Sequence, residues 1–298
     1  MVKFELIDQV HCANLLGEGV QWNHYSQTVW WTDIKSAKLY CYNPGTKNLQ
    51  HWNMPEPVAC FAFVENDSRM LIAFASGIAW FDIATSAVEW ISLPESELEG
   101  NALNDGRVDR QGRFWVGSIV EENTVPDQAA SLYCLDTHQQ LSPHLTGLTI
   151  SNGLCWSLDS RKLYHTDSPT RRINIYDFDP ATGTLANGKL FAEVPAGVEP
   201  DGACVDAHDF VWSAQFGGGD VLRFAPDGRE DCRLELPVTQ PTCVAFGGVD
   251  MDLLFVTSAR KGLPSEALAN QPFAGNLFIY RTDTKGVLEN WYRPQTSR

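Results

Sequence analysis

The chain has 298 residues, of which 44% are hydrophobic and 20% are charged, and its formal net charge is −15. This length allows one large all-β domain or two ordinary domains. Lys and Arg form no run that could follow a phosphate backbone, which argues against nucleic acid as a partner. No apolar stretch is long enough to span a membrane and the start lacks signal-peptide features, so we expect a cytoplasmic protein with no membrane partner.

The eight cysteines are scattered along the chain and form no CxxC pair. Several lie inside apolar, strand-like runs such as GLCWSL and GACVDA. This placement favours buried free thiols over disulfides and agrees with a reducing compartment.

The first predicted strand is the run KFELIDQ, at residues 3–9, which we expect to join the last sheet of the chain. From Gly17 onward one phrase recurs: a small or polar residue, an apolar run, a short polar turn and an aromatic-rich second run. In chain order its six copies begin GEGVQW, ACFAFV, NDGRVD, NGLCWS, DGACVD and TCVAFG. Each copy closes with a third strand-like run, and tails such as LFAEVP and RLELP supply a fourth.

Equivalent positions in the six copies, the repeat anchors, are occupied by Glu18, Ala59, Asn104, Asn152, Asp201 and Thr242. Successive anchors lie 41, 45, 48, 49 and 41 residues apart. Six units of about four strands match the blades of a β-propeller, and the copies lack the 3.6-residue periodicity of helical repeats. The sequence therefore predicts an all-β, six-bladed β-propeller with about four antiparallel strands per blade, as a single domain over residues 1–298.

The first strand of each propeller blade lines the central channel, so equivalent positions of different blades meet around the axis. The anchors would bring together the carboxylates of Glu18 and Asp201 and the carboxamides of Asn104 and Asn152. Such oxygen donors suit Ca²⁺, Mg²⁺ or Mn²⁺, and Zn²⁺ can also accept them. The sequence therefore predicts a polar or metal-binding site at one mouth of the channel.

A structural interpretation of the same residues is also open. A single Asn-Gly or Asp-Gly before a strand is typical of a turn, in which Gly153 would let the chain turn into the strand. For Asp105, in the phrase NDG, we favour this interpretation and expect a turn residue.

The recurring phrases resemble the gluconolactonase and senescence-marker-protein (regucalcin) family of six-bladed propellers over essentially the whole chain. The matching phrases are GEGVQW, NDGRVDRQGRFWVG, SNGLCWSLDSRKLYHTDS, PDGACVDAHDFVW, and CVAFGG followed by LFVTSAR. The resemblance implies that Glu18, Asn152 and Asp201 hold one divalent metal ion, which could be Ca²⁺, Zn²⁺, Mn²⁺ or Mg²⁺. It also implies that Asn104 faces the substrate and that Glu122 lies near the pocket.

The chain departs from the family pattern at Ala102, where many members have an arginine two residues before the asparagine. A basic contact to the substrate is therefore missing at this position. Asn101 is one candidate to replace part of it, and a contact from another blade is the alternative.

The resemblance implies a lactonase that hydrolyses a sugar lactone, a small molecule, to the corresponding aldonic acid. The metal ion would polarise the lactone carbonyl and activate water, and Asp201 would act as the general base. A propeller of this size is self-contained, so we expect a monomer. Two alternatives are an arylesterase-like or phosphotriesterase-like hydrolase on the same scaffold, and a non-catalytic calcium-binding regulatory protein.

Overall fold

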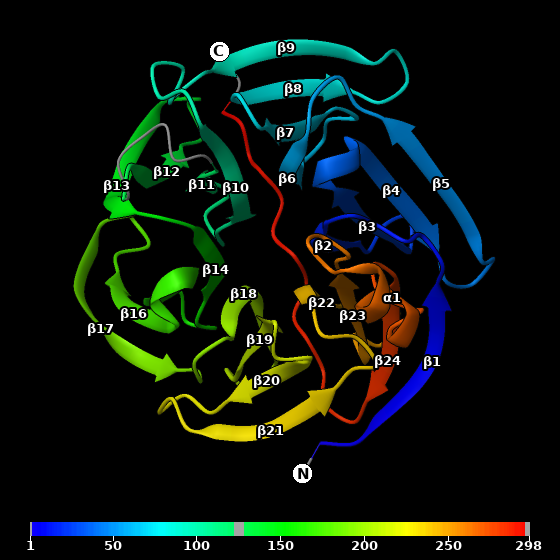
Figure 1. The fold of residues 1–298 in the computed structure, drawn as a ribbon. Coiled ribbons are helices and arrows are strands. Elements are labelled where there is room, and N and C mark those ends of the chain that lie inside the picture. Colours follow the sequence, from blue (N-terminus) through cyan, green and yellow to red (C-terminus); the bar gives the residue numbers. More distant parts are fainter. Residues whose placement is uncertain (1, 122–127, 296–298) are drawn as a thin grey trace.

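Six four-stranded antiparallel sheets surround one central axis in the computed structural model, which describes residues 2–121 and 128–295 (Figure 1). Each sheet is a blade, and the blades are numbered 1 to 6 in chain order of their innermost strands. This arrangement is the six-bladed β-propeller expected from the repeat.

Blades 1 to 5 each consist of four consecutive strands, which follow one another from the axis outward. Blade 1 contains β2 (Gly17–Asn23), β3 (Thr28–Asp33), β4 (Lys38–Asn43) and β5 (Asn48–Asn53). Blade 2 contains β6 (Val58–Phe63), β7 (Met70–Phe74), β8 (Ile78–Asp82) and β9 (Ala87–Ser92). Blade 3 contains β10 (Asn101–Val108), β11 (Phe114–Val120), β12 (Ala130–Leu135) and β13 (Leu141–Leu148).

Blade 4 contains β14 (Ser151–Trp156), β15 (Lys162–Asp167), β16 (Arg172–Phe178) and β17 (Leu185–Glu193). Blade 5 contains β18 (Glu199–Val205), β19 (Val211–Phe216), β20 (Asp220–Phe224) and β21 (Glu230–Glu235). Blade 6 contains β22 (Pro241–Gly247), β23 (Leu253–Ser258), β24 (Leu277–Thr282) and β1 (Phe4–Val10). The short helices are η1 (Ile34–Ser36), η2 (Ser168–Thr170) and α1 (Ser265–Asn270). No helix in the described ranges is long and apolar enough to cross a membrane.

The ring is closed by the N-terminal strand, as the run at residues 3–9 predicts. β1 pairs antiparallel with β24, from Phe4 opposite Thr282 to Val10 opposite Leu277. The first strand of the chain thus forms the outer edge of the last blade, which ties the two ends of the repeat together.

Neighbouring blades pack through layers of apolar and aromatic side chains. Trp22 of blade 1 stacks on Phe255 of blade 6, with ring centroids 5.4 Å apart, and both side chains are buried. The eight cysteines are free, and all except Cys12 are buried, in agreement with the sequence analysis.

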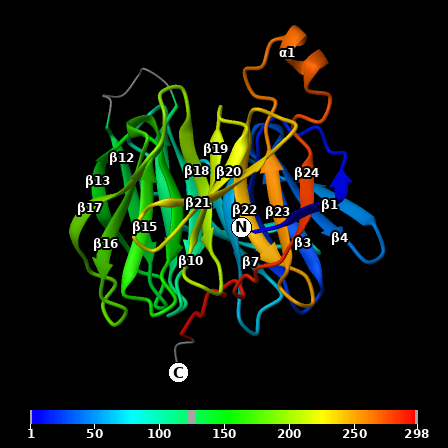
Figure 2. The ribbon, with the colours of Figure 1, turned by 90° about the horizontal axis from the view of Figure 1, so that it is seen from below.

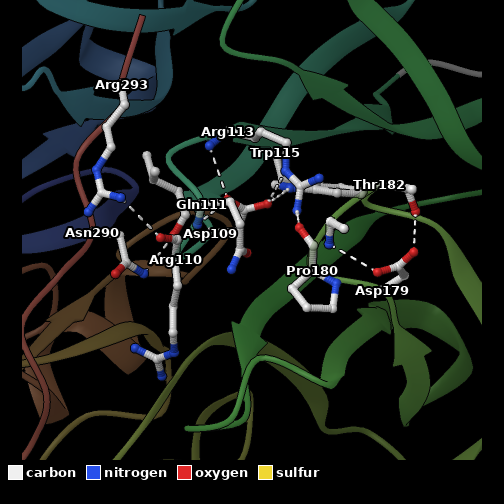
Figure 3. A network of polar contacts seen from close by, with 12 residues as sticks. Asp109, Arg110, Gln111, Arg113, Trp115, Asp179, Pro180, Thr182, Asn290 and Arg293 are labelled. Atoms are coloured by element: carbon white, nitrogen blue, oxygen red, sulfur yellow. Dashed lines mark hydrogen bonds and ion pairs between the residues drawn. The ribbon is translucent and has the colours of Figure 1, made fainter.

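Turn aspartates hold the hairpins of blades 3 and 5. Asp109 accepts hydrogen bonds from the indole Nε1 of Trp115 at 2.8 Å and from Nε of Arg113 at 2.6 Å (Figure 3). Asp206 repeats the indole contact with Trp212 at 3.0 Å, six positions later in the chain as in blade 3. Because each carboxylate joins a turn to the next strand, the repeated Asp and Trp fix the first hairpin of these blades.

Each innermost strand carries a register irregularity near its repeat anchor, and this changes the interpretation of Asn152 and Gly153. Both residues lie inside β14, where the pairing shifts between Asn152 and Cys155, so the expected turn before the strand is wrong. The equivalent shift in β2 lies between Glu18 and Gln21. Gly153 has φ +66°, a conformation that glycine adopts without strain, and the bulge redirects the preceding side chain.

The chain's last segment crosses the axis on the face opposite α1 (Figure 2). Tyr292 forms a parallel bridge with Val64, just after β6, and Gly286 bridges to Asp206, just after β18. Both contacts are made where inner strands end, so this segment covers one end of the channel. The candidate functional site lies at the other end, where the inner strands begin.

Candidate metal centre and substrate pocket

A pocket of about 90 Å³ opens at the end of the axis where the inner strands begin. Its polar lining consists of Glu18, Asn104, Asn152, Ser168, Glu199, Asp201 and Lys261, and its apolar lining of Leu16, Ile119, Ile150 and Phe216. Four of the sequence-predicted site residues therefore meet in one pocket: Glu18, Asn104, Asn152 and Asp201.

Glu18 and Asp201 form a buried pair of carboxyl groups in the lining of this pocket. Their side chains hydrogen-bond to each other, and each residue is less than 9% exposed. Burial, and then the charge of Asp105, raises the pKa of Glu18 to about 8. Burial, followed by the charges of Glu18 and Asp105, raises the pKa of Asp201 well above its ordinary value. Two carboxylates this close cannot both ionise readily without a nearby positive charge.

Asn152 lies next to this pair and is held by neighbours on both sides. Its Oδ1 accepts a hydrogen bond from Nδ2 of Asn104 at 2.8 Å, and its Nδ2 donates to Oγ of Ser168 at 2.9 Å. Ser168 in turn donates to the carbonyl of Pro200, next to Asp201, at 2.8 Å. This chain of contacts joins blades 3, 4 and 5. The Asn152 amide is oriented so that both hydrogen bonds can form, which places its oxygen toward Asn104.

Asp105 is a buried strand residue, so the expectation of a turn was wrong. It lies inside β10 and is 6% exposed, and its Oδ2 accepts the backbone N–H of Leu154 at 3.4 Å. The sequence alone suggested a turn because NDG has turn composition, whereas the bulge between Leu103 and Gly106 accommodates the phrase inside a strand. Burial raises the pKa of Asp105, and the charge of Arg107 opposes that effect.

Arg107 is a buried cation two positions after Asp105 in β10, and it does not line this pocket. Its Nη1 pairs with Oε1 of Glu289 in the C-terminal segment at 2.7 Å, and its Nη2 donates to the carbonyl of Val244 at 3.0 Å. Its guanidinium thus already has partners of its own. Within the described residues, Glu18 and Asp201 have no ion pair with any basic side chain.

Two aspartates fix the backbone immediately before two of the predicted ligands. Asp33 accepts hydrogen bonds from the backbone N–H groups of residues 15 and 16, at 3.0 Å each, three and two positions before Glu18. Asp167 does the same for residues 149 and 150, at 3.1 and 2.8 Å, three and two positions before Asn152. The phrases WWTD and YHTD thus supply equivalent supports for the pocket in blades 1 and 4.

The other sequence-predicted residues lie elsewhere. Asn101 lines a separate cavity under the loop between β9 and β10, where its Nδ2 donates to Glu95 at 2.9 Å. Glu122 lies outside the described residues. The anchors of the two remaining blades carry no oxygen toward the pocket: Ala59 is a buried core residue, and the Thr242 hydroxyl donates to the carbonyl of Gly17.

Ser168, Glu199 and Lys261 line the pocket but were not singled out from the sequence. Ser168 could have been found from hairpin pairing, because it follows β15, whose Thr166 lies opposite Asn152. Lys261 lies in a loop after β23 and has no equivalent in the repeat, so no periodic signal marks it.

The donor set fits a divalent cation. Glu18, Asp201 and the carboxamide of Asn152 supply hard oxygen ligands from three blades, and the surrounding burial leaves their negative charge poorly solvated. No cluster of three or more His, Cys, Asp or Glu side chains suited to a metal was found in residues 2–121 and 128–295, and the third donor in this pocket is an asparagine. A cation would offset both the burial of the two carboxylates and the repulsion between their charges.

Comparison with known proteins identifies relatives along almost the whole chain. L-arabinolactonase of Azospirillum brasilense is 38% identical over 92% of this chain and 91% of its own. 6-Deoxy-6-sulfogluconolactonase of Pseudomonas putida is 34% identical over 94% of this chain and 96% of its own. The crystal structure of regucalcin, a calcium-binding protein from Agrobacterium tumefaciens, superposes with a TM-score of 0.91 at 30% identity, covering 97% of this chain and 98% of the other.

The family described as SMP-30/Gluconolactonase/LRE-like region matches residues 16–260, which run from just before Glu18 to the loop that carries Lys261. The resemblance noted in the recurring phrases is thereby confirmed, and the protein belongs to the SMP-30/gluconolactonase/LRE-like family.

Proposed function

We propose that the protein is a lactonase that hydrolyses a sugar lactone to the corresponding aldonic acid, with a divalent metal ion held by Glu18, Asn152 and Asp201. The observation that carries this proposal is the convergence of these three residues and Asn104 in one pocket. Relatives named as lactonases, at 34 and 38% identity over more than nine-tenths of both chains, support the reaction class.

The lining of the pocket supports a sugar lactone over an aryl ester. Seven of its eleven described lining residues are polar, and the carboxylate, carboxamide and hydroxyl groups among them are available to substrate hydroxyls. An aryl ester would be served better by a broad apolar pocket.

A divalent ion held by Glu18, Asn152 and Asp201 would supply Lewis acidity for the lactone carbonyl and would lower the pKa of a neighbouring water. Asp201 accepts the proton of the attacking water and returns it to the ring oxygen when the bond between the carbonyl carbon and that oxygen breaks. For this role Asp201 must be ionised, and a cation in the pocket favours ionisation against the effect of burial. Glu18 and Asn152 hold the site, and Asn104 orients substrate oxygens through its amide.

Calcium is the first metal to test, because the regucalcin structure is described as that of a calcium-binding protein. That likeness also supports the second candidate function, a non-catalytic calcium-binding protein. The two functions differ in turnover: the second binds calcium in the same pocket and opens no lactone.

The test is a proton-release assay on a panel of 1,4- and 1,5-aldonolactones, run with a chelator and again after restoring Ca²⁺, Mn²⁺, Mg²⁺ or Zn²⁺. The proposal expects turnover of at least one lactone, its loss with the chelator, and its return with metal. Full activity after exhaustive metal removal would refute the metal-dependent mechanism. Calcium binding without turnover of any lactone would favour the non-catalytic alternative.

A further inference from the structure

Lys261 holds a fixed position at the rim of the pocket. Its backbone N–H donates to the carbonyl of Leu15 at 2.9 Å, and its carbonyl accepts Nε2 of Gln240 at 3.1 Å. These contacts tie the residue to the loop before Glu18 and to the start of blade 6. The backbone is therefore anchored, while the exposed side chain lines the pocket.

The side chain of Lys261 is positively charged, unlike the other charged side chains that line this pocket. Among the described lining residues Lys261 alone is basic, whereas Glu18, Glu199 and Asp201 are acidic. Its ammonium has no ion pair with any described residue. Lys35, near the same mouth, is by contrast paired with Glu121.

The order of the blades places Lys261 across the axis from Asn104. Lys261 belongs to blade 6 and Asn104 to blade 3, and these blades face each other in the six-membered ring (Figure 1). In blade 3, the position two residues before Asn104 carries no cation, because Ala102 is a buried alanine. The side of the pocket formed by blades 3 and 4 is lined by uncharged residues, namely Asn104, Ile119, Ile150, Asn152 and Ser168.

We propose that Lys261 determines substrate specificity and that the preferred substrate is a lactone with an anionic substituent, such as a carboxylate or sulfonate, at the end remote from the lactone carbonyl. This inference rests on the proposed lactonase function and names the substrate class of the same pocket. An anionic substituent is otherwise disfavoured by the acidic pocket and by a net charge of −15. A flexible, unpaired ammonium at the rim supplies the compensating charge.

The sharpest test compares D-glucaro-1,4-lactone with D-glucono-1,4-lactone, which have the same ring and differ in a carboxylate or hydroxymethyl group at C6. In Lys261→Met we expect kcat/KM for the glucaro-lactone to fall by about tenfold, mainly through KM. For the neutral glucono-lactone we expect a change below about threefold. Lys261→Arg should keep most of the activity on the anionic substrate, because the charge is retained.

Lys189→Met is the matched control, since it removes the same charge from the exposed face of β17, on the outer strand of blade 4. This variant should have the same kcat/KM as the wild-type protein for both lactones. An equal loss on both lactones in Lys261→Met, or no loss on the glucaro-lactone, would overturn the assignment of Lys261.

A binding experiment separates this proposal from the proposed function. Calorimetric titration with D-glucarate and D-gluconate makes the same comparison without turnover. If the wild-type protein opens no lactone but prefers glucarate, and Lys261→Met abolishes that preference, the lactonase function fails while the anion site stands. If lactones are opened but the variant binds both acids like the wild type, Lys261 has no part in specificity.

Discussion

The carboxyl groups of Glu18 and Asp201 hydrogen-bond to each other although they belong to blades 1 and 5, which are separated by blade 6 in the ring. Both are buried, and Asp105 adds a third acidic group nearby. Closure of the ring by β1 and β24 therefore brings two like charges together in a site that water solvates poorly.

The metal-free protein should lose stability as the pH rises from about 4.5 to about 8. The pKa of Glu18 is raised from 4.5 to about 8 in the folded state, so the folded protein keeps a proton that the unfolded chain has already released. The stabilisation is fully present below pH 4.5 and is lost as the pH rises through 8, with a slope of up to about 1.4 kcal/mol per pH unit. This change in the free energy of unfolding can be measured by urea denaturation in the presence of a chelator between pH 5 and 8.5. In Glu18→Gln the free energy of unfolding should depend less steeply on pH. An unchanged dependence would contradict the assignment of this effect to Glu18.

Replacing either carboxylate should abolish metal-dependent turnover. We expect Asp201→Asn and Glu18→Gln to lower kcat/KM by at least about a thousandfold, because each change removes a proposed charged ligand and Asp201 is also the proposed base. Steady-state kinetics and metal titration measure the two effects. Asp227→Asn is the control, since this residue is exposed and, among the residues that the structure describes, forms an ion pair only with Arg229, two positions later. Near-wild-type turnover in Asp201→Asn would exclude it as ligand and base.

Asp33 should control metal affinity without touching the metal. Asp33→Ala leaves the two backbone N–H groups before Glu18 without their acceptor, so the loop that positions this ligand loosens. We expect metal affinity to fall by about 10- to 100-fold and the free energy of unfolding by about 1–3 kcal/mol. Asp82→Ala provides the comparison, because this carboxylate also accepts two backbone N–H groups, but in a turn of blade 2 away from the pocket. Equal metal affinity in both variants would mean that Asp33 has only a structural role.

Glu289→Ala should destabilise the fold through the buried Arg107. The side chain of Arg107 is 6% exposed and would lose its carboxylate partner, which for a buried pair costs about 3–5 kcal/mol. Glu65→Ala breaks the exposed pair with Arg293 in the same C-terminal segment and should cost less than about 1 kcal/mol. Chemical denaturation of the two variants checks the difference. Similar decreases in the free energy of unfolding in the two variants would show that solvent enters around Arg107 and screens its charge.

The fold was predictable because its signal is repeated. Six copies of one phrase predicted six blades, and the extra run at residues 3–9 predicted the closing strand that β1 provides. The anchors Glu18, Asn104, Asn152 and Asp201 were predictable for the same reason, since equivalent positions of a closed ring must converge. Asp105 was misjudged because the local composition of NDG cannot distinguish a turn from a bulge within a strand.

The sequence by itself determined the number of blades, the strand that closes the ring and the oxygen-bearing residues at the channel mouth. These features depend on the pattern of apolar residues within each copy and on the spacing between copies. Both can be seen in the sequence without knowledge of tertiary contacts. Only the tertiary structure decided that Glu18 and Asp201 share a hydrogen bond, that Asp105 is buried beside them, and that Lys261 faces the pocket. Such contacts depend on bulges, loops and ring closure acting together, because burial and electrostatic coupling exist only between groups that folding brings within a few ångströms.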